Sequence, residues 1–443
     1  MKLFQRLLVA PAALGLLAPL AANATEVNLN DISNYSSEEV EIDSNSFKNQ
    51  TTINPLLAGG EGLSHSHDGG DSFTDTTTMT GKAVFAIGSM DGAESIGLTE
   101  TTQTMYTYTL NLNTSFTGED NLYVRLRTGD SGASSIFAKK TAGYHTDRYS
   151  STTDVLAVDK IWYQFPVGDN FTAWVAPKIE NYYMYAATPS IYQPGALKAF
   201  KLGGNSAVFG ASTNVGAGVK YQVGDSPWAF STNLVSKGGR GANGAYEVLG
   251  DADTSKWDTM IAYTKPQWHA SLTASVQHNG WSSFSYYATK QAASLDNSAM
   301  VDGSDDGQNK PNGLAYAFRT YWRPAESGTI TPEVTIGYDV LSISNNGTGK
   351  VKEANSYMIG LNWKDMFRAD DTIGVAFGAP LRATSLEGDG DPNDVDATMW
   401  EIYYSFKPND SIEVTPAVFG ASDIYEDSED DITGVMVTTK FKF

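Results

Sequence analysis

The chain has 443 residues, of which 12% are aromatic, with a formal net charge of −21 at pH 7 and no cysteine. The negative charge argues against a nucleic-acid partner, which requires a basic footprint, and the lack of cysteine excludes a fold held by disulfides. A mean hydropathy of −0.29 with abundant glycine is typical of a secreted β-protein or an outer-membrane barrel.

The first 24 residues have the pattern of a cleaved secretory signal. Lys2 and Arg6 give a positive n-region, residues 7–20 form an apolar stretch, and residues 22–24 give a small-x-small cleavage site. An uncleaved membrane anchor is the alternative, but an apolar stretch of about 14 residues is too short to cross a bilayer. We therefore predict cleavage after Ala24.

Residues 25–79 are rich in Ser, Asn, Asp and Thr and show no sustained period, so we predict an irregular N-terminal segment in the periplasm. Within it, His65, His67, Asp68 and Asp71 are residue types that bind metals. A polar tract without regular structure explains them as well, and we predict no metal site and no cofactor.

From residue 80 to residue 443 apolar and polar residues alternate with the period of two expected for β-strands. In the last strand Val435, Val437 and Phe441 share one face, while Lys440 and Lys442 share the other. A lipid-facing barrel strand needs this arrangement, although a soluble sheet can alternate in the same way. The candidate strands are 81–90, 103–116, 120–128, 155–165, 171–178, 213–223, 227–236, 257–264, 267–277, 313–324, 329–341, 355–364, 372–382, 397–406, 410–421 and 432–443.

The connections between these strands are more informative than the strands, because short and long connections alternate without exception. Successive connections of an antiparallel barrel lie on opposite rims, so the alternation predicts short periplasmic turns on one rim and long extracellular loops on the other. A soluble sandwich gives no reason for such sorting. We predict an all-β transmembrane antiparallel barrel of about 16 strands with both termini on the periplasmic side. The long loops are 91–102, 129–154, 179–212, 237–256, 278–312, 342–354, 383–396 and 422–431.

A barrel of about 16 strands is too wide for side chains to fill, so it encloses an aqueous lumen unless a segment plugs it. Loop 179–212 is rich in tyrosine and proline and is the candidate to fold inward and narrow the pore. A solvated surface loop is the alternative. The tyrosines that would form the constriction are Tyr182, Tyr183, Tyr185 and Tyr192.

The predicted inward faces carry more basic than acidic residues beneath acidic loops. Mid-strand basic residues would favour anions such as phosphate or bicarbonate. In the alternative, these charges are solvated or pair with carboxylates of inward-folded loops. The basic residues are Arg125, Arg127, Lys160, Lys178, Lys220, Arg319, Arg323, Lys364, Lys440 and Lys442, and the acidic residues are Glu333, Asp339, Glu401 and Glu413.

Several segments carry a resemblance to a known family. They are residues 1–24 with VNLNDISNY at 27–35, TTTMTGKAVF at 76–85, LNTSFTGEDNL at 112–122 with RLR at 125–127, and WYQFPVGD at 162–169. These segments resemble cyanobacterial outer-membrane porins of the carbohydrate-selective (OprB-like) family. The resemblance covers most of the chain.

The resemblance implies a homotrimer in outer-membrane lipid that lets ions and small hydrophilic solutes diffuse passively, with carbohydrates as the label of the family. Such porins usually carry an S-layer-homology domain and a coiled coil before the barrel. Residues 25–79 show no heptads, so we expect this chain to lack that domain. We also expect the strand that ends at Phe443 to engage the barrel-assembly machinery.

Two other functions stay open. The acidic loops would suit cell-surface contacts of a structural or adhesive barrel without a conducting pore. An outer-membrane hydrolase would need a nucleophile near a base, and His269 is expected to face inward near Ser271. A lone inward histidine is more often an ordinary lumen residue, so we predict that the protein is not an enzyme.

Overall fold

The computed structural model describes most of the chain from residue 76 onward. The predicted signal peptide, its cleavage at Ala24, the segment up to residue 75 and the histidines within it lie outside the described residues. No helix in the described part is long and apolar enough to cross a membrane. The described residues are 76–92, 94, 99–130, 136–137, 154–204, 208–209, 214–237, 239–240, 246–248, 253–281, 311–344, 347–388, 392, 397–423 and 431–443.

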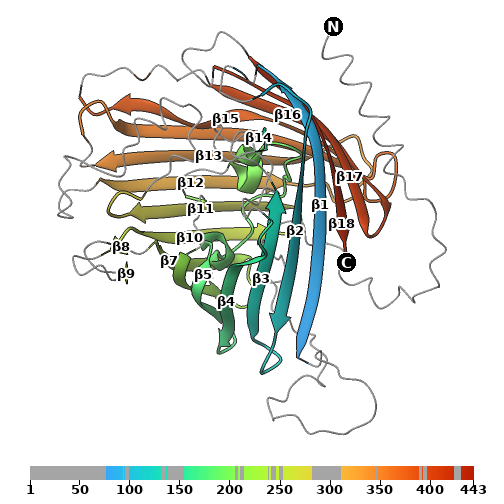
Figure 1. The fold of residues 1–443 in the computed structure, drawn as a ribbon. Helices are drawn as coiled ribbons and strands as arrows, with labels where there is room; N and C mark the ends of the chain where they lie inside the picture. The colour runs from blue at the N-terminus through green and yellow to red at the C-terminus, as the bar shows by residue number, and fades with distance from the viewer. Residues whose placement is uncertain are drawn as a thin grey trace, which may run out of the picture.

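Sixteen antiparallel strands form one closed barrel, which confirms the predicted fold (Figure 1). Each strand pairs with its neighbours along the chain, and β1 pairs with β18 to close the ring. The barrel strands are β1 (Thr77–Asp91), β2 (Gln103–Thr114), β3 (Asn121–Asp130), β4 (Ala157–Val167), β5 (Phe171–Ile179), β6 (Asn214–Gln222), β7 (Trp228–Ser236), β10 (Ser255–Lys265), β11 (Trp268–Gln277), β12 (Asn312–Trp322), β13 (Glu333–Ser344), β14 (Val351–Lys364), β15 (Thr372–Leu386), β16 (Thr398–Asn409), β17 (Ile412–Ser422) and β18 (Ile432–Lys442). A separate two-stranded sheet, β8 (Gly239–Arg240) with β9 (Tyr246–Glu247), lies outside the ring.

The two faces of the barrel wall differ as the period of two requires. Along β11, Trp268, Leu272 and Val276 are exposed on the outer face, whereas His269 and Thr273 are buried on the inner face. Large apolar side chains on the outside and polar side chains within are the pattern of a barrel that spans a membrane.

Aromatic rings gather on the outer face near the rim of short turns. Tyr263 packs against Trp228 and Trp268 with centroid distances of 4.8 Å in both pairs, and Phe171 packs on Tyr221 at 4.7 Å. Tyrosine and tryptophan combine an apolar ring with a polar tip, which suits the boundary between lipid and water. This rim therefore has the aromatic girdle of an outer-membrane barrel.

The last residue of the chain takes part in closing the ring. The amide of Gly81 donates to the carbonyl of Phe443 at 2.6 Å, and the amide of Phe443 donates to the carbonyl of Gly81 at 3.0 Å. The ring of Phe443 lies over Gly81, where a Cβ would overlap it, and stacks on Tyr108 at 5.8 Å. The apolar terminus thus extends the β1–β18 ladder by one residue.

The alternation of short and long connections is wrong at one place. Residues 323–332 separate β12 from β13, whereas only residues 345–350 separate β13 from β14. Pro324 and Pro332 lie within the first connection and have no amide to donate to a ladder, so β13 begins only at Glu333. On the opposite rim the pairing of β13 with β14 continues into residues that the sequence assigned to a loop.

Asp120 organises the turn between β2 and β3. Its Oδ1 accepts hydrogen bonds of 2.8 Å from the amides of Phe116 and Thr117 and from the hydroxyl of Ser115, and its Oδ2 accepts one of 2.6 Å from Tyr163. Burial alone would raise the pKa of Asp120. The bonds from Tyr163, Thr117 and Ser115 outweigh burial and hold this pKa well below its ordinary value.

We expect Asp120→Ala to lower the free energy of unfolding by about 1–3 kcal/mol at pH 7, because the two amides lose their acceptor. A carboxyl whose pKa is lowered by folding stabilises the fold above its unfolded pKa of about 3.9, and this stabilisation is lost as the pH falls through the folded value. Urea unfolding in detergent should therefore show a constant difference from the wild type between about pH 5 and pH 8, which shrinks in strong acid. Glu119→Gln, in the same turn but exposed, is the control, and an equal loss in both variants would contradict this role of Asp120.

Candidate functional site

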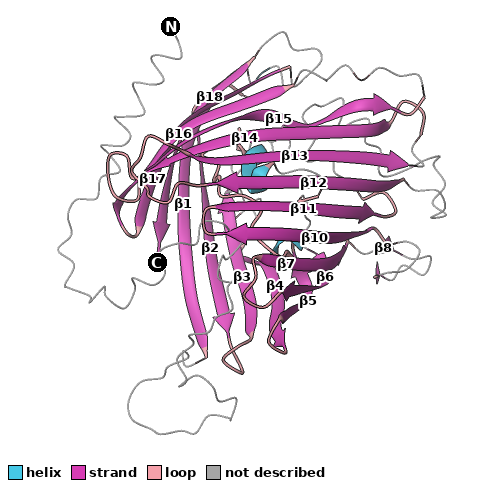
Figure 2. Ribbon diagram, turned by 180° about the vertical axis from the view of Figure 1, so that it is seen from behind, coloured by secondary structure: helices cyan, strands magenta, loops and turns pink. Residues whose placement is uncertain are grey.

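The connection between β5 and β6 folds into the barrel. We call its described residues, 180–204 and 208–209, the inward loop. It contains two short 3-10 helices, η5 (Asn181–Met184) and η6 (Lys198–Gly203), which lie within the ring of strands in Figure 2. The four tyrosines named from the sequence, Tyr182, Tyr183, Tyr185 and Tyr192, are all buried in this loop, so the alternative of a solvated surface loop does not hold for them.

A carboxylate on β16 binds one end of the inward loop. The Oε1 of Glu401 accepts hydrogen bonds from the Tyr192 hydroxyl at 2.7 Å and the Gly195 amide at 3.0 Å. Its Oε2 accepts from the amides of Ala196 and Leu197 at 2.9 and 2.7 Å. Glu401 is fully buried and has no contact with water. The four donors supply the hydrogen bonds that water would give to an exposed carboxylate.

Glycines on the inner wall make room for the aromatic rings at this end. The ring of Tyr192 lies over Gly360 of β14, and the ring of Tyr403 lies over Gly374 of β15, so a Cβ at either glycine would overlap the ring. Gly195 of the loop in turn lies directly over Tyr403. The absence of side chains at these positions lets the loop approach the wall closely.

An arginine on β12 binds the other end of the loop. The guanidinium of Arg319 donates to the carbonyls of Leu202 and Gly204 at 2.8 and 2.6 Å, and to both carboxylate oxygens of Asp339 at 2.9 Å. Ser356 donates to the same carboxylate at 3.0 Å. Arg319 and Asp339 are both buried, and this pairing neutralises each charge.

The backbone of the loop is shaped to present these carbonyls. Leu202, Gly203 and Gly204 have φ values of 59°, 73° and 107° in the left-handed region, where a leucine is strained. The carbonyl oxygen of Gly203 lies so close to Gly337 on β13 that a Cβ there would overlap it. Glycine at position 337 is therefore required for the loop to reach the wall.

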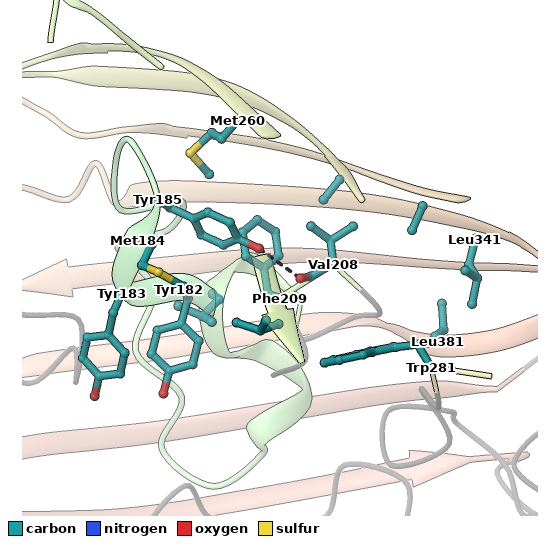
Figure 3. Packing of buried hydrophobic residues seen from close by; sticks show 14 of the residues in the cluster. Tyr182, Tyr183, Met184, Tyr185, Val208, Phe209, Met260, Trp281, Leu341 and Leu381 are labelled. Carbon is teal, nitrogen blue, oxygen red and sulfur yellow. Dashed lines mark hydrogen bonds between the residues drawn. The ribbon is translucent and has the colours of Figure 1, made fainter. Parts of the chain in front are cut away.

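A third contact lies on β10. The Oδ2 of Asp258 accepts hydrogen bonds from Asn181 at 2.6 Å and from the Tyr185 hydroxyl at 3.0 Å. In Figure 3 the hydroxyl of Tyr185 points toward the carbonyl of Val208. Lys256 donates to the same carbonyl. Asp258 and Lys256 are fully buried, and neither was predicted from the sequence to face inward.

The fourth contact joins β3, β4 and the first residue of the loop. Lys160 pairs with Glu180 at 2.6 Å, and Arg125 pairs with Asp159. Arg125 also lies 3.5 Å from the Tyr183 hydroxyl. Asp159 is the extra residue of a bulge, since Arg125 is opposite Lys160 while the next pair along β3 skips residue 159. A bulge re-aims a side chain in this way.

Most of the charged residues predicted to face inward do so, but few of them are open to the lumen. Lys220 is buried on the inner wall, and Arg127 and Arg323 are partly exposed. The predicted residues of the four contacts, Arg125, Lys160, Arg319, Asp339 and Glu401, are buried. The remaining charges pair along the wall: Glu413 lies 3.0 Å from Lys440 and 3.6 Å from Lys442, and Glu333 lies 3.1 Å from Lys364.

Lys178 is the exception among the predicted inward residues. A register shift between Ala176 and Ile179 places Ile179, which is fully buried, at the inward position. Lys178 is exposed instead, and its Nζ donates to the carbonyl of Val158 at 2.9 Å. The period of two fails here because the bulge adds a residue to one strand.

The inner surface also carries charges of both signs that were not among those predicted, with Lys82, Lys201 and Lys256 on the basic side. Asp159 and Asp258 add two carboxylates to the inner wall, and Glu180 adds one from the loop. Strict alternation with the exposed Trp257 would have assigned Asp258 and Lys256 to the inner face. The position of Asp159 depends on the bulge, for which we find no sequence signal.

The serine and histidine considered for an enzyme lie on the inner face of β11. The Nε2 of His269 lies 2.9 Å from the Ser271 hydroxyl, and its Nδ1 lies 2.8 Å from the Thr264 hydroxyl. In a catalytic triad a carboxylate binds the second nitrogen of the histidine, whereas here the hydroxyl of Thr264 does so and carries no charge to stabilise an imidazolium. Both His269 and Ser271 are also buried. This geometry favours a structural role. Within the described residues no three His, Cys, Asp or Glu side chains are arranged to hold a metal ion.

Comparison with known proteins gives a family match over most of the chain. A family model described as "Carbohydrate-selective porin, OprB family" matches residues 50–419. An uncharacterized protein of Nostoc sp., alr4550, is 25% identical over an alignment of 398 residues, which covers 83% of this chain. The match covers 66% of the length of that relative, so the chain spans just under two thirds of it.

Solved structures share the fold at low sequence identity. The structure of Pseudomonas putida OprB at high pH is similar over 83% of this chain and 94% of that chain, with a TM-score of 0.56 and 10% identity. A loop-deletion mutant of OmpT, an outer membrane protein of Vibrio cholerae, aligns over 83% of this chain and 99% of its own with a TM-score of 0.49 and 8% identity. At such identities the likeness to the first structure concerns the fold alone.

We expect Glu401→Gln to loosen the adjacent part of the inward loop. The amide nitrogen of glutamine cannot accept a hydrogen bond, so at least one pair of the four donors loses its acceptor. Hydrogen exchange followed by mass spectrometry should show the amides of residues 195–197 exchanging about tenfold faster. Glu413→Gln, an inward carboxylate on β17 that pairs with lysines instead, is the matched control. Equal protection of residues 195–197 in wild type and Glu401→Gln would contradict the role of Glu401.

Proposed function

Because the chain belongs to the OprB family of carbohydrate-selective porins, and is thus an outer-membrane porin, we propose that it conducts inorganic ions and small hydrophilic solutes, carbohydrates among them, by passive diffusion. The observation that carries this proposal is the closed ring with apolar residues outside and polar residues within. The family and the fold are those of a channel rather than an enzyme. An adhesive barrel without a pore remains the second candidate.

We propose that the inward loop sets the width of the channel. Its four contacts lie on β3, β4, β10, β12 and β16, so the loop occupies that part of the interior. In this proposal the conducting path follows the inner faces of β18, β1 and β2 and the part of β3 around Arg127. Partly exposed cationic side chains lie there, namely Lys442, Lys82 and Arg127.

The charges along this path support a preference for anions. Arg125 and Lys160 are matched by Asp159 and Glu180, so their fields are largely neutralised. Arg127 is partly exposed on the lumen side and acts at short range on passing ions. Selectivity in this proposal depends on the exposed cations and not on the total count.

We propose that the signal peptide is cleaved after Ala24, that residues 25–79 lie in the periplasm, and that the mature chain forms a homotrimer surrounded by outer-membrane lipid. The strand that ends at Phe443 is proposed to engage the barrel-assembly machinery. The support for this is its place in the closing ladder.

We expect the purified protein in planar bilayers to give stepwise currents that rise with salt concentration.

A Cβ at Gly337 would displace the Gly203 carbonyl away from the wall and into the lumen, so Gly337→Ala should lower the single-channel conductance by some tens of per cent. Gly347→Ala is the matched control, because a Cβ there meets only Lys350 at 3.7 Å. Silent membranes with folded protein would refute the channel, and unchanged conductance in Gly337→Ala would refute the constriction.

We expect Arg127→Glu to shift the reversal potential in a salt gradient toward that of a cation-preferring channel, because it reverses a charge on the proposed path. Lys178→Glu makes the same charge change at a site that the structure places outside the lumen, and it should leave the potential unchanged. A shift of equal size in both variants would contradict the proposed path. Liposome swelling with mono- and disaccharides tests whether sugars pass as well.

A further inference from the structure

Two turns on the rim of short connections have the same construction. The turn between β2 and β3 reads Phe-x-x-x-Asp from Phe116 to Asp120, and the turn between β14 and β15 reads the same from Phe367 to Asp371. In both turns the aspartate is buried, whereas the phenylalanine is exposed, by 48% for Phe116 and by 73% for Phe367. An exposed phenylalanine beside a buried carboxylate reverses the usual distribution of these residue types.

In the first turn a tyrosine of β4 completes the arrangement. Tyr163 donates its hydroxyl to Asp120 at 2.6 Å, and its ring lies 6.3 Å from the ring of Phe116 and 5.4 Å from that of Phe165. Trp162, the preceding residue, is buried in one cluster with the inward loop, so Tyr163 points to the outer face. Phe116 is therefore held on the outer side of the wall.

The second turn repeats these contacts with a tyrosine of β16. Tyr404 donates its hydroxyl to Asp371 at 3.0 Å, and its ring lies 5.9 Å from the ring of Phe367 and 5.6 Å from that of Phe406. Three amides of the turn also donate to Asp371, at 2.8 to 3.0 Å. Tyr403 lies against the inward loop, so Tyr404 and the ring that packs on it face outward.

Two features favour bilayer lipid as the partner of the exposed rings. Each ring packs on an outward tyrosine and so extends the aromatic girdle of the outer face toward the tip of its turn. The two turns are separated by four strands one way around the ring and by eight strands the other way. A bilayer surrounds the ring and reaches both turns, whereas one protein partner would have to extend around the barrel.

We propose that Phe116 and Phe367 insert into the lipid leaflet at this rim and fix the depth of the barrel in the membrane. Moving a phenylalanine side chain from water into an apolar environment is favourable. Exposed charged residues follow in the same turns, Glu119 in the first and Arg368 and Asp370 in the second, and these stay in water. The boundary between lipid and water then passes through each turn, and this holds whether or not the barrel conducts.

The test uses fluorophores at single positions in the full-length protein. The chain has no cysteine, so one introduced cysteine can carry an environment-sensitive fluorophore. We expect the label at Phe116→Cys and at Phe367→Cys to lose about half of its emission in phosphatidylcholine vesicles that contain lipid with a nitroxide near the headgroup. Glu119→Cys and Ala369→Cys, exposed in the same turns, are the matched controls. Their labels should keep nearly all of their emission there and be quenched by iodide supplied on both sides of the membrane.

Three outcomes would overturn the inference. Iodide quenching at positions 116 and 367 as strong as in the controls would place the rings in water. Emission that neither quencher reduces would mean that protein, such as a second copy of the chain, covers the rings. Equal quenching by the lipid nitroxide at all four positions would show that the fluorophore and not the turn seeks the lipid. Heat-modifiable gel mobility shows that each labelled variant is folded, and currents in planar bilayers report separately on the proposed channel.

Discussion

The structure depends on the closure of one hydrogen-bonded ring. A lipid environment offers no partner for a backbone amide or carbonyl, so every strand must be paired on both sides and the first strand must meet the last. Here β1 pairs with β18 from Lys82 to Asp91, and Phe443 adds the final two bonds to Gly81. Closure then dictates the alternation along every strand, because one face meets lipid and the other meets the interior.

The interior poses a different physical problem, since a ring of this width cannot be filled by its own side chains. The inward loop occupies part of it, and buried charges on the wall hold the loop in place. Glu401 accepts hydrogen bonds from amides of the loop, whereas Arg319 donates hydrogen bonds to carbonyls of the loop. The two residues therefore bind the N–H and the C=O groups of the loop backbone, respectively. Charges used in this way are neutralised where they stand and contribute little to the field in the channel.

The strands and their faces could be predicted because the period of two is a local signal. Lys178 and the connection 323–332 escaped it for local reasons of another kind, a bulge and two prolines. The contacts of the inward loop had no local signal, because Glu401 lies more than 200 residues from the amides that it binds. A tyrosine-rich composition could suggest that this loop turns inward, but it could not indicate which wall residues receive it.

Two features of the wall fix the position of the loop. Charged residues form hydrogen bonds with it, and glycines leave room for it because they have no Cβ. Gly337 and Gly360 lie where a Cβ would overlap the carbonyl of Gly203 and the ring of Tyr192. On β18, β1, β2 and β3 the inner wall instead carries partly exposed cationic side chains. The residues that bind the loop are therefore distinct from Lys442, Lys82 and Arg127, although β3 carries both Arg125 and Arg127. In the proposed channel, substitutions of these three cations can alter solute preference while the contacts of Glu401 and Arg319 stay in place.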